Sequence, residues 1–522
     1  MKVLHVCAEF FPLLKTGGLA DVVAALPPAQ RQHGADARVL VPGFPAIINQ
    51  LADKQKVTTL NTFAGEVTLF YCLYNDTPLY LIEAPHLYQR EGSPYHDGYN
   101  NAYQDNYRRF GLLGFIAAEL ARGCDPLWQA DIVHAHDWHA ALACAYLAAY
   151  GYPARCMFTI HNIAYQGLFS PHHIHELWLP PEFYNVDGME FFGQLSFMKA
   201  GLFYADHTNA VSPTYAKEIL NPHYAYGLDG LLNRLNHEQR LSGILNGIDT
   251  EVWSPSSDAL IAQKYSERSV KNKVKNKLAL QQSLGLAQQT DKPLFAVVSR
   301  MTRQKGLDLI LEILPDLLSS GSQFVLLGSG DHDLENAYRH AQSQYPDQVR
   351  AIIGYDEPLS HQVIAGADVL MVPSRFEPCG LTQLYALRYG TLPLVRNTGG
   401  LADTVTDCSL EAIKRKEATG FVFNESHAAD LKSAIDRALA LWDSPAQWQQ
   451  VQKNAMAKDV SWQKSAEAYL NIYRRVLGRW VLGPVNNSIY LPIYKRWSFK
   501  RSPKSINLNV REISIMRNSI LR

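Results

Sequence analysis

The sequence predicts an α/β protein built from two doubly wound, parallel sheets. Short apolar runs alternate with amphipathic, helix-like segments along both halves of the chain. In addition, the hexapeptide Thr-Gly-Gly-Leu-Ala-Asp occurs twice, at 16–21 and at 398–403, each time between an apolar run and a helix-like pattern. A strand, a Gly-Gly turn and a helix together present free backbone N–H groups to an anion. We therefore expect two Rossmann-like halves that face one shared, phosphate-bearing ligand.

Continuous apolar runs are typical of parallel strands that are covered on both faces. In the first half we predict strands at Val3–Cys7, Arg38–Val41, Leu79–Ile82, Ile132–Ala135, Met157–Ile160 and Thr208–Val211. In the second half we predict them at Leu294–Val298, Phe324–Leu327, Ala351–Ile353, Val369–Val372 and Leu392–Val395. Between them lie helical patterns, such as the spacing of Leu307, Ile310 and Leu314. Ligands of such sheets bind beyond the carboxyl ends of the strands, so two facing sheets predict an interdomain cleft.

The length of 522 residues accommodates two or three domains. We place the first domain at 1–245 and the second at 250–460, with the junction at the Leu-Asn-Gly-Ile-Asp sequence of 245–249. The Lys- and Asn-rich stretch 265–277 is predicted to be polar surface near this junction.

The amino-acid composition is typical of an ordinary globular protein. Hydrophobic residues make up 47% and charged residues 19% of the chain, as in ordinary globular proteins, and a net charge of zero gives no indication of nucleic-acid binding. The seven cysteines form no CxxC pair, which predicts buried thiols in a reducing compartment. The first apolar run is too short for a signal peptide, and the Ala-rich run 140–150 is too short for a membrane span. We expect a cytoplasmic protein with no membrane partner.

Charge is unevenly distributed at the end of the chain. Residues 481–522 hold eight Lys and Arg side chains against Glu512 alone, which gives 8 − 1 = +7, so residues 1–480 sum to −7. We expect residues 479–522 to be a basic, weakly ordered extension.

Polar residues gather where the predicted strands end. The run 132–139 (Ile-Val-His-Ala-His-Asp-Trp-His) ends a strand in three imidazoles, a carboxylate and an indole. Zinc is one interpretation of three histidines. A sugar-binding rim fits better, because an indole supplies a flat apolar face while Asp and His bind hydroxyls. We therefore predict no metal here.

Two further strand ends carry binding chemistry. Arg300 and Lys305 flank a turn that opens a helix at Gly306, a position that suits a diphosphate. Glu377 precedes the Pro-Cys-Gly-Leu-Thr sequence of 378–382, whose N–H groups are predicted to bind sugar hydroxyls and phosphate. Cys379 at a helix start is a candidate for a thiol of lowered pKa, although the backbone alone explains the motif.

The sequence Asp-His-Asp at 331–333 has the form of the D-x-D motif of metal-dependent glycosyltransferases. It follows Gly-Ser-Gly at a strand end, where Asp is a natural turn or helix-capping residue. We interpret it as a cap.

With these motifs in order, residues 1–478 resemble bacterial glycogen synthase, the ADP-glucose-dependent relative of starch synthase. The resemblance rests on Lys-Thr-Gly-Gly-Leu at 15–19, His-Asp-Trp-His at 136–139, Ser-Arg at 299–300 with Lys-Gly at 305–306, Ser-Arg-Phe-Glu-Pro-Cys-Gly-Leu at 374–381, and Thr-Gly-Gly-Leu at 398–401. It implies a GT-B fold, in which two Rossmann-like domains face a cleft and a C-terminal helix, here 461–478, crosses back to the first domain. It also implies retaining glucosyl transfer from ADP-glucose to the non-reducing end of an α-1,4-glucan, glycogen or a malto-oligosaccharide, without a metal or another cofactor.

The resemblance also implies roles for single residues. The expected catalytic residues are Glu377, Arg300, Lys305, Asp137 and His161. The expected donor-binding residues are Lys15, Gly17, Gly18, Asp21, Asn246, Tyr355, Cys379, Gly380, Leu381 and Thr382, with Tyr355 stacked on adenine. The expected acceptor-binding residues are Tyr95 and Trp138.

Several alternatives stay open at this point. One alternative is a GT-B transferase that uses UDP-glucose or another acceptor. A phosphorylase of similar architecture is a second, and it would need pyridoxal phosphate on a lysine. A non-catalytic protein that binds glucan or nucleotide would show binding without turnover. Retention is compatible with a carboxylate nucleophile or with acceptor deprotonation by the leaving phosphate on the same face.

Overall fold

The first half of the chain forms a mixed, nine-stranded sheet. The computed structural model describes residues 1–99 and 101–481. The strands of this sheet run in the order β12-β11-β7-β6-β1-β2-β5-β4-β3. Pairing is parallel from β12 to β5, and β4 is antiparallel to both of its neighbours, β5 and β3. The bounds are β1 (Lys2–Val6), β2 (Asp36–Pro42), β3 (Gln55–Thr62), β4 (Gly65–Tyr74), β5 (Thr77–Glu83), β6 (Ile132–His136), β7 (Arg155–Ile160), β11 (His207–Ala210) and β12 (Leu241–Gly243).

The second half forms a six-stranded sheet in which every pairing is parallel, in the order β15-β14-β13-β16-β17-β18. Its strands are β13 (Leu294–Val298), β14 (Gln323–Gly328), β15 (Val349–Ile353), β16 (Val369–Val372), β17 (Leu392–Arg396) and β18 (Phe421–Phe423). A small antiparallel sheet of β8 (Leu168–Phe169), β9 (Glu190–Phe191) and β10 (Gln194–Ser196) lies apart from both.

All eleven predicted strands are present, with ends shifted by at most two residues. The strands that were missed are peripheral. Strand β3 is mostly polar and lies at the sheet edge, and β4 is only partly buried although its residues 69–74 are apolar. Strands β12 and β18 have only three residues each. A prediction built on continuous apolar runs finds strands that are buried on both faces and overlooks half-exposed or short ones.

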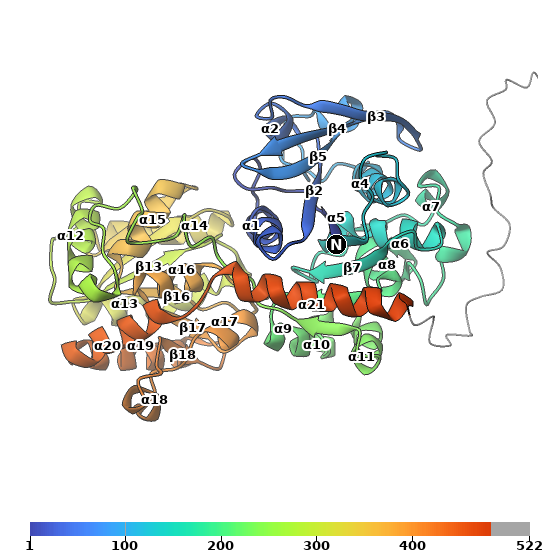
Figure 1. The fold of residues 1–522 in the computed structure, drawn as a ribbon. Helices are drawn as coiled ribbons and strands as arrows, with labels where there is room; N and C mark the ends of the chain where they lie inside the picture. The colour runs from blue at the N-terminus through green and yellow to red at the C-terminus, as the bar shows by residue number, and fades with distance from the viewer. Residues whose placement is uncertain (100, 482–522) are drawn as a thin grey trace, which may run out of the picture. The chain divides into compact units, whose positions relative to one another are not determined.

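Helices cover the faces of both sheets, as expected for doubly wound domains (Figure 1). Those of the first half are α1 (Gly18–Gln32), α2 (Pro45–Ile48), α3 (Pro85–Tyr88), α4 (Asn106–Ala121), α5 (Asp137–Ala140), α6 (Leu142–Ala149), α7 (His173–Glu176), α8 (Phe197–Tyr204), α9 (Pro213–Glu218), α10 (Pro222–Ala225) and α11 (Asp229–His237). Those of the second half are α12 (Lys273–Ser283), α13 (Leu307–Ser319), α14 (His332–Gln344), α15 (Glu357–Gly366), α16 (Thr382–Tyr389), α17 (Gly399–Thr404), α18 (Leu410–Lys414), α19 (Ala428–Trp442) and α20 (Pro445–Ala457). Helix α13 buries Leu307, Ile310 and Leu314, as its spacing predicts.

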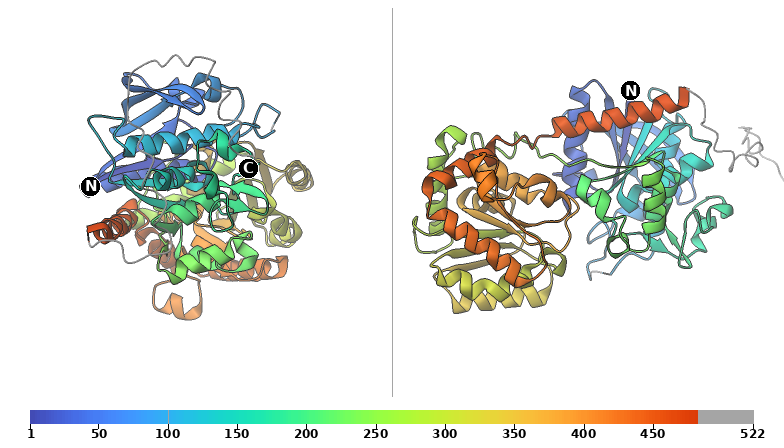
Figure 2. Two further views of the ribbon diagram at one scale, coloured as in Figure 1. Left: turned by 90° about the vertical axis from the view of Figure 1, so that its right-hand side faces the viewer. Right: turned by 90° about the horizontal axis from the view of Figure 1, so that it is seen from below.

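The C-terminal helix crosses back to the first domain. Helix α21 (Trp462–Val481) packs against α1 at the N-terminal end of the chain (Figure 1, Figure 2). Its buried Tyr469 and Tyr473 share a hydrophobic cluster with Val3 and Val22. The Nε2 group of Gln30 in α1 donates a hydrogen bond to the Tyr473 hydroxyl at 3.1 Å. The predicted crossover helix is therefore present, and it continues through residues 479–481; the rest of the predicted extension lies outside the described residues.

The prediction of polar surface at 265–277 is only partly correct, because Glu267, Arg268, Lys271 and Lys275 are exposed whereas other polar residues of the segment are buried. Lys273 and Lys277 of α12 are almost fully buried. The Lys273 ammonium donates to the carbonyl of Ala365 and to the Thr391 hydroxyl, both at 2.6 Å. Lys277 forms an ion pair with Asp368 at 2.8 Å. These partners lie about ninety or more residues further along the chain, so the local sequence gave no sign of them.

The two domains touch through a reciprocal contact between α9 and α17. The backbone N–H and hydroxyl of Thr214, in the first turn of α9, both donate to Asp403 of α17 at 2.8 Å. In the other direction, Thr398 Oγ1 and the Gly399 N–H, at the start of α17, donate to Glu218 of α9 at 2.9 and 3.0 Å. Each helix thus supplies a carboxylate to the N-terminus of the other, a favourable arrangement for a helix dipole.

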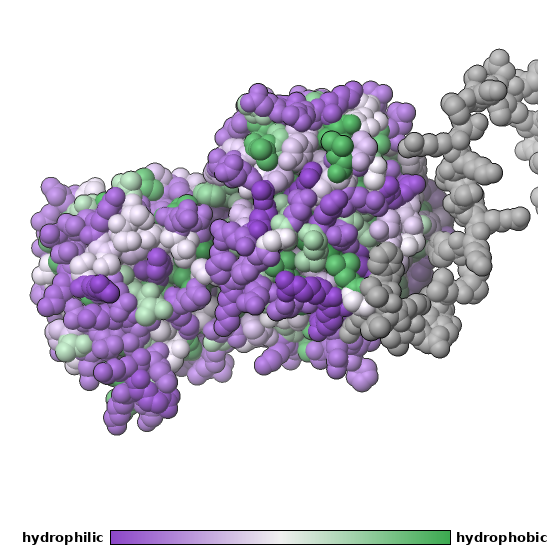
Figure 3. Space-filling model, viewed as in Figure 1, coloured by the Kyte–Doolittle hydropathy of each residue, from purple (hydrophilic) through white to green (hydrophobic). Residues whose placement is uncertain are grey.

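On the face drawn in Figure 3, hydrophobic residues form small separate patches among hydrophilic ones. Among the helices in the described part of the chain, none combines the length and the hydrophobicity that crossing a membrane requires.

Candidate functional site

The loop between β1 and α1 carries the first Gly-Gly motif. The Lys15 ammonium contacts the Asp21 carboxylate of α1 at 3.0 Å, and both side chains are partly buried. Burial raises the pKa of Asp21 to about 6, an effect that the nearby Lys15 charge opposes. A Cβ atom on Gly18 would lie 3.4 Å from Leu381 Cδ1. The loop therefore meets the Pro-Cys-Gly-Leu segment of the second domain, as a shared site requires.

Glu9 fixes this loop, and the sequence analysis missed it. The Glu9 carboxylate accepts hydrogen bonds from the Thr16 N–H at 2.7 Å and from the Thr16 hydroxyl at 2.5 Å. It also accepts one from the hydroxyl of Tyr95, whose ring stacks on His139. Glu9 is only 2% exposed. A carboxylate just after a buried strand was the available signal, but its partners lie on two different loops.

The β6–α5 turn presents Asp137 in an unusual backbone conformation, with φ of 60°. Its Oδ1 accepts hydrogen bonds from the backbone N–H groups of His161 and Asn162, which follow β7, at 3.2 and 3.4 Å. Burial raises the pKa of the Asp137 carboxyl to about 7. The neighbouring Trp138 ring packs edge-on against Phe110, with centroids 5.0 Å apart. Three of the predicted residues, Asp137, Trp138 and His161, thus lie at the carboxyl ends of two adjacent strands.

In the second domain the predicted cation and carboxylate lie together. The Lys305 Nζ is 2.5 Å from Glu377 Oε2, which also accepts a hydrogen bond from the Ser374 hydroxyl at 2.9 Å. Glycine is required at 306: φ is 69°, and a Cβ atom there would lie 2.1 Å from the Pro373 carbonyl oxygen. The turn that holds Lys305 therefore presses directly on the loop that holds Glu377. Arg300, on the same turn, is exposed.

The segment from Cys379 to Thr382 leads into helix α16, as predicted. Gly380 has φ of 74°, and Gln383 Nε2 donates to the carbonyls of Cys379 and Gly380 at 2.9 Å. The expectation of a lowered thiol pKa is wrong, because burial raises the pKa of Cys379 to about 12. A thiol held in its neutral form is no nucleophile.

Asn246, at the domain junction, provides an unused acceptor. It is 8% exposed, its backbone N–H interacts with the Cys379 sulfur, and its Oδ1 atom is buried without a hydrogen-bond partner within the described chain. Such an atom costs free energy unless a ligand pairs with it. By contrast, Tyr355, which follows β15, is 71% exposed, and its hydroxyl is hydrogen-bonded to Glu357.

The second Gly-Gly motif does not face a ligand. The Glu218 carboxylate already accepts from Thr398 and from the Gly399 N–H, and the Gly400 N–H bonds to the Glu377 and Pro378 carbonyls. The expectation that this copy binds phosphate is therefore wrong, since a protein carboxylate and two backbone carbonyls occupy its donors.

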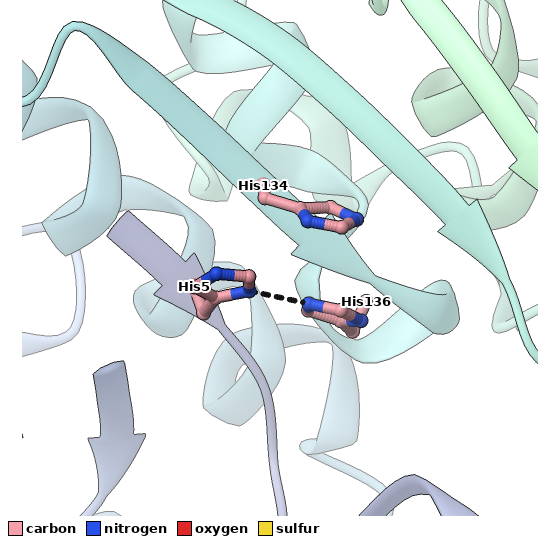
Figure 4. Close-up of side chains that lie close together, drawn as sticks. All are labelled: His5, His134 and His136. Atoms are coloured by element: carbon pink, nitrogen blue, oxygen red, sulfur yellow. Dashed lines mark hydrogen bonds between the residues drawn. The ribbon is translucent and has the colours of Figure 1, made fainter. Parts of the chain in front are cut away.

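Possible metal ligands come together at one place in the described chain. The imidazoles of His5, His134 and His136 have nitrogen atoms within 4.8 Å of one another (Figure 4). The sequence placed two of these histidines on one strand but gave no indication that His5 would join them. The Asp-His-Asp sequence at 331–333 starts helix α14 and belongs to no such group among the residues described.

Comparisons with known proteins agree with this geometry. Residues 2–234 match the family model described as the starch synthase catalytic domain, and residues 282–455 match glycosyl transferases group 1. Glycogen synthase from Edwardsiella ictaluri is 61% identical over 477 residues, and that from Serratia proteamaculans is 59% identical over 476 residues. Each alignment covers 91% of this chain and all of the relative.

Solved structures point to the same fold. The catalytic domain of starch synthase IV from Arabidopsis thaliana, bound to ADP and acarbose, superposes with a TM-score of 0.84 at 32% identity, over 92% of this chain and 99% of that one. Sucrose-phosphate synthase from Thermosynechococcus elongatus gives a TM-score of 0.55 at 16% identity, over 91% and 99%, which supports the fold alone.

Proposed function

The chain belongs to the glycogen synthase family of GT-B glycosyltransferases, and we propose that it elongates glycogen by retaining transfer of glucose from ADP-glucose. Membership makes it a glucosyltransferase of glycogen synthesis that uses a nucleotide sugar and a glucan. The choice of ADP-glucose, the residue roles, the domain limits at 1–245 and 250–460 with the crossover helix at 461–478, and a cytoplasmic location are our proposals. We also propose that the reaction uses neither metal nor cofactor.

The observation that carries the proposal is the contact between Lys305 and Glu377. The Lys305 ammonium lies 2.5 Å from Glu377 beyond the carboxyl ends of β13 and β16, where ligands of parallel sheets bind. We propose that Lys305 and Arg300 hold the diphosphate and offset the negative charge that grows as ADP leaves, while Glu377 lies beside the glucose ring. Lys305 is paired with Glu377, so a diphosphate that binds there competes with this carboxylate for its charge.

The other proposed contacts follow from the positions of each side chain. From the first domain, Lys15 with Gly17, Gly18 and Asp21 approaches the donor phosphates. From the second, Gly380, Leu381 and Thr382 offer backbone N–H groups at the start of α16, with Cys379 held neutral behind them. Asn246 Oδ1 is a free acceptor for a sugar hydroxyl, while Asp137 and His161 line the glucose and Tyr95 and Trp138 the acceptor end. Tyr355 is exposed, as a residue that stacks on adenine has to be before binding.

The proposal is tested by measuring ADP release from purified protein, ADP-glucose and glycogen. We expect turnover with ADP-glucose and at most a small rate with UDP-glucose at equal concentration. Digestion of the product with an α-1,4-specific exoglucosidase reports the anomeric outcome. The variant Glu377→Gln, which keeps size but removes charge, should bind ADP and lack turnover. Binding of ADP-glucose by the wild type without ADP release would show a non-catalytic protein, and equal rates with both donors would reject the donor assignment.

A further inference from the structure

Three buried or half-buried imidazoles, those of His5, His136 and His161, form one hydrogen-bonded row that ends at the proposed glucose site. His5 Nδ1 lies 3.0 Å from His136 Nε2, and His136 Nδ1 lies 3.0 Å from His161 Nε2. Figure 4 shows the first of these contacts, between β1 and β6. His5 and His136 are fully buried, whereas His161 is only half-buried. The row therefore connects the middle of the sheet to its exposed carboxyl edge.

A metal ion does not explain this arrangement. Both ring nitrogens of His134 are occupied, one by the Tyr473 hydroxyl and the other by the Thr159 hydroxyl, each at 2.7 Å. The two facing nitrogens of His5 and His136 are 3.0 Å apart, which is a hydrogen-bond distance. A cation would break these bonds in a site with no access for its own water ligands.

The direction of every bond in the row follows from Gln30. His5 Nε2 lies 2.8 Å from Gln30 Oε1, which can only accept, so His5 carries its proton on Nε2. Its Nδ1 then accepts from His136 Nε2–H, and His136 Nδ1 in turn accepts from His161 Nε2–H. The amide itself is oriented by α21, because Gln30 Nε2 donates to the Tyr473 hydroxyl at 3.1 Å. Burial keeps the rings neutral, lowering the pKa of His5 to about 4 and that of His161 to about 3.

We propose that Gln30, His5 and His136 are positioning residues that hold His161 as the Nε2–H tautomer, with Nδ1 left as a hydrogen-bond acceptor for a hydroxyl of the donor glucose. The proposal rests on the proposed place of His161 at the donor site. Within residues 1–99 and 101–481 no hydrogen bond to His161 Nδ1 is found, so this lone pair is available. In the other tautomer Nδ1 would carry the proton and would donate to the glucose hydroxyl. Donor and acceptor would then have to exchange in every hydrogen bond of the row. Helix α21 thereby helps to set the tautomer of His161 although it does not contact the substrate.

The tautomer is measured directly by long-range nitrogen–proton NMR of protein labelled with 15N at histidine. The His161 signals are assigned by their loss in His161→Gln. We expect Nε2 to be protonated and Nδ1 to be unprotonated throughout pH 6–8. A protonated Nδ1 would overturn the proposal whatever the activity of any variant. Zinc retained at about one equivalent after purification and dialysis would overturn it as well, because the row would then be a metal site.

Matched variants separate positioning from stability. His5→Leu removes the acceptor that orients His136, and His5→Asn returns an acceptor close to the position of Nδ1. We expect kcat/KM for ADP-glucose to fall about tenfold in His5→Leu, the value of roughly one hydrogen bond, and by less than about threefold in His5→Asn. The control is His207→Leu, which removes a buried imidazole of the same sheet that lies outside the row and bonds to Ser242 Oγ at 3.0 Å; it should lower the melting temperature and keep kcat/KM within about twofold.

A double-mutant cycle tests whether His5 acts through His161. In the background of His161→Ala, His5→Leu should cause no further loss of kcat/KM. Independent, multiplying losses would show that His5 acts by another route and would overturn the positioning role. If His161→Ala alone had wild-type kinetics, His161 would not be part of the donor site, and that part of the proposed function would be wrong. The NMR measurement would still test the tautomer of the row independently.

Discussion

At the scale of single residues, Asp137 combines two unfavourable features at one position. Its backbone has φ of 60°, a left-handed conformation that costs free energy for any residue with a Cβ atom, and its carboxylate is 6% exposed with no cation paired to it in the described structure. Among the described residues, two backbone N–H groups donate hydrogen bonds to this carboxylate. Strain and an uncompensated carboxylate at a strand end are typical of functional sites.

The variant Asp137→Asn should be inactive. Its free energy of unfolding should exceed that of the wild type by an amount that increases as pH rises. The folded pKa of about 7 lies above the reference value of 3.8, so between these values the folded state holds the proton more tightly. The stability that protonation contributes is full below about pH 4 and is lost as pH rises through 7. Asparagine retains the acceptor and does not ionise. Urea unfolding at pH 5 and pH 8 should show a larger benefit of the variant at pH 8. The exposed Asp436→Asn serves as control, and an equal benefit at both values would contradict the raised pKa.

The second residue-scale prediction concerns Lys305. Lys305→Ala should lower kcat by about 10²–10³-fold with a smaller change in the KM for glycogen, because one contact to developing charge on the leaving group is removed. Initial rates of ADP release give both constants. The matched control is Lys432→Ala, which removes a surface ion pair with Asp436 on α19. A kcat near that of the wild type would exclude Lys305 from the diphosphate site.

At the scale of elements, the two copies of Thr-Gly-Gly-Leu-Ala-Asp make different contacts in the structure. In the first copy Asp21 pairs with Lys15 beside the proposed phosphate site. In the second, Asp403 and the Gly399 N–H lock α17 to α9 of the other domain. The same sequence thus starts a helix in both copies, at Gly18 in the first and at Gly399 in the second, and the tertiary surroundings decide what its polar groups bind.

Removing either carboxylate of this contact should weaken the domain interface. We expect Glu218→Ala and Asp403→Ala each to lower the free energy of unfolding by about 1 kcal/mol, the usual value of a helix N-cap. Chemical denaturation measures the loss, and the exposed Asp436→Ala is the control. If both variants were as stable as the control, these hydrogen bonds would contribute no more to the free energy of unfolding than hydrogen bonds to water do.

At the scale of the whole molecule, the chain passes between the domains at two places, and these lie side by side. Ile248 pairs with Ser461 in a parallel bridge, and its N–H donates to the Val460 carbonyl at 2.8 Å. A Cβ atom on Gly247 would clash with the Ser461 backbone at 2.6 Å. These paired segments are the natural hinge for any change in the relation of the two domains.

We predict that the domains close on the nucleotide. Lys15 belongs to the first domain, whereas Arg300, Lys305 and Thr382 belong to the second, so one diphosphate that touches both sets favours the closed form. The radius of gyration from solution scattering should fall when ADP or ADP-glucose is added, and Lys15→Ala should weaken this response. The exposed Lys432→Ala should respond as the wild type does. A profile that stays the same at saturating nucleotide would mean that the cleft is preformed or that the two-sided site is wrong.

Removal of residues 482–522 should leave activity within about threefold and should not lower the melting temperature, as expected of a terminus that is not needed by the core. The alignments with the glycogen synthases from Edwardsiella ictaluri and Serratia proteamaculans cover all of each relative but 91% of this chain. Calorimetry and ADP release compare the truncated and full chains. A large fall in melting temperature would show that the extension packs on the enzyme.

Local pattern was sufficient for the sheets and for the outline of the site. Parallel strands such as β13 and β16 are buried on both faces, so their apolar runs stand out in the sequence. The residues that we propose to bind the donor follow these strands, so the sequence predicts Lys305 and Glu377 as site residues, and the structure brings the two into contact. The sequence by itself therefore determined the fold class, the order of the elements and the type of site.

The hydrogen-bond partners and the burial of polar side chains were decided only by the tertiary structure. His5 meets His136 across 131 positions, and Gln30 meets Tyr473 across 443. Lys273 is buried because acceptors from α15 and from the segment before β17 surround it, and Cys379 has a raised pKa because it is enclosed. Hydrogen-bond partners and burial depend on what surrounds a side chain in three dimensions. Local sequence fixes the conformation of a segment, whereas the environment of each polar atom is set by segments that lie hundreds of residues away.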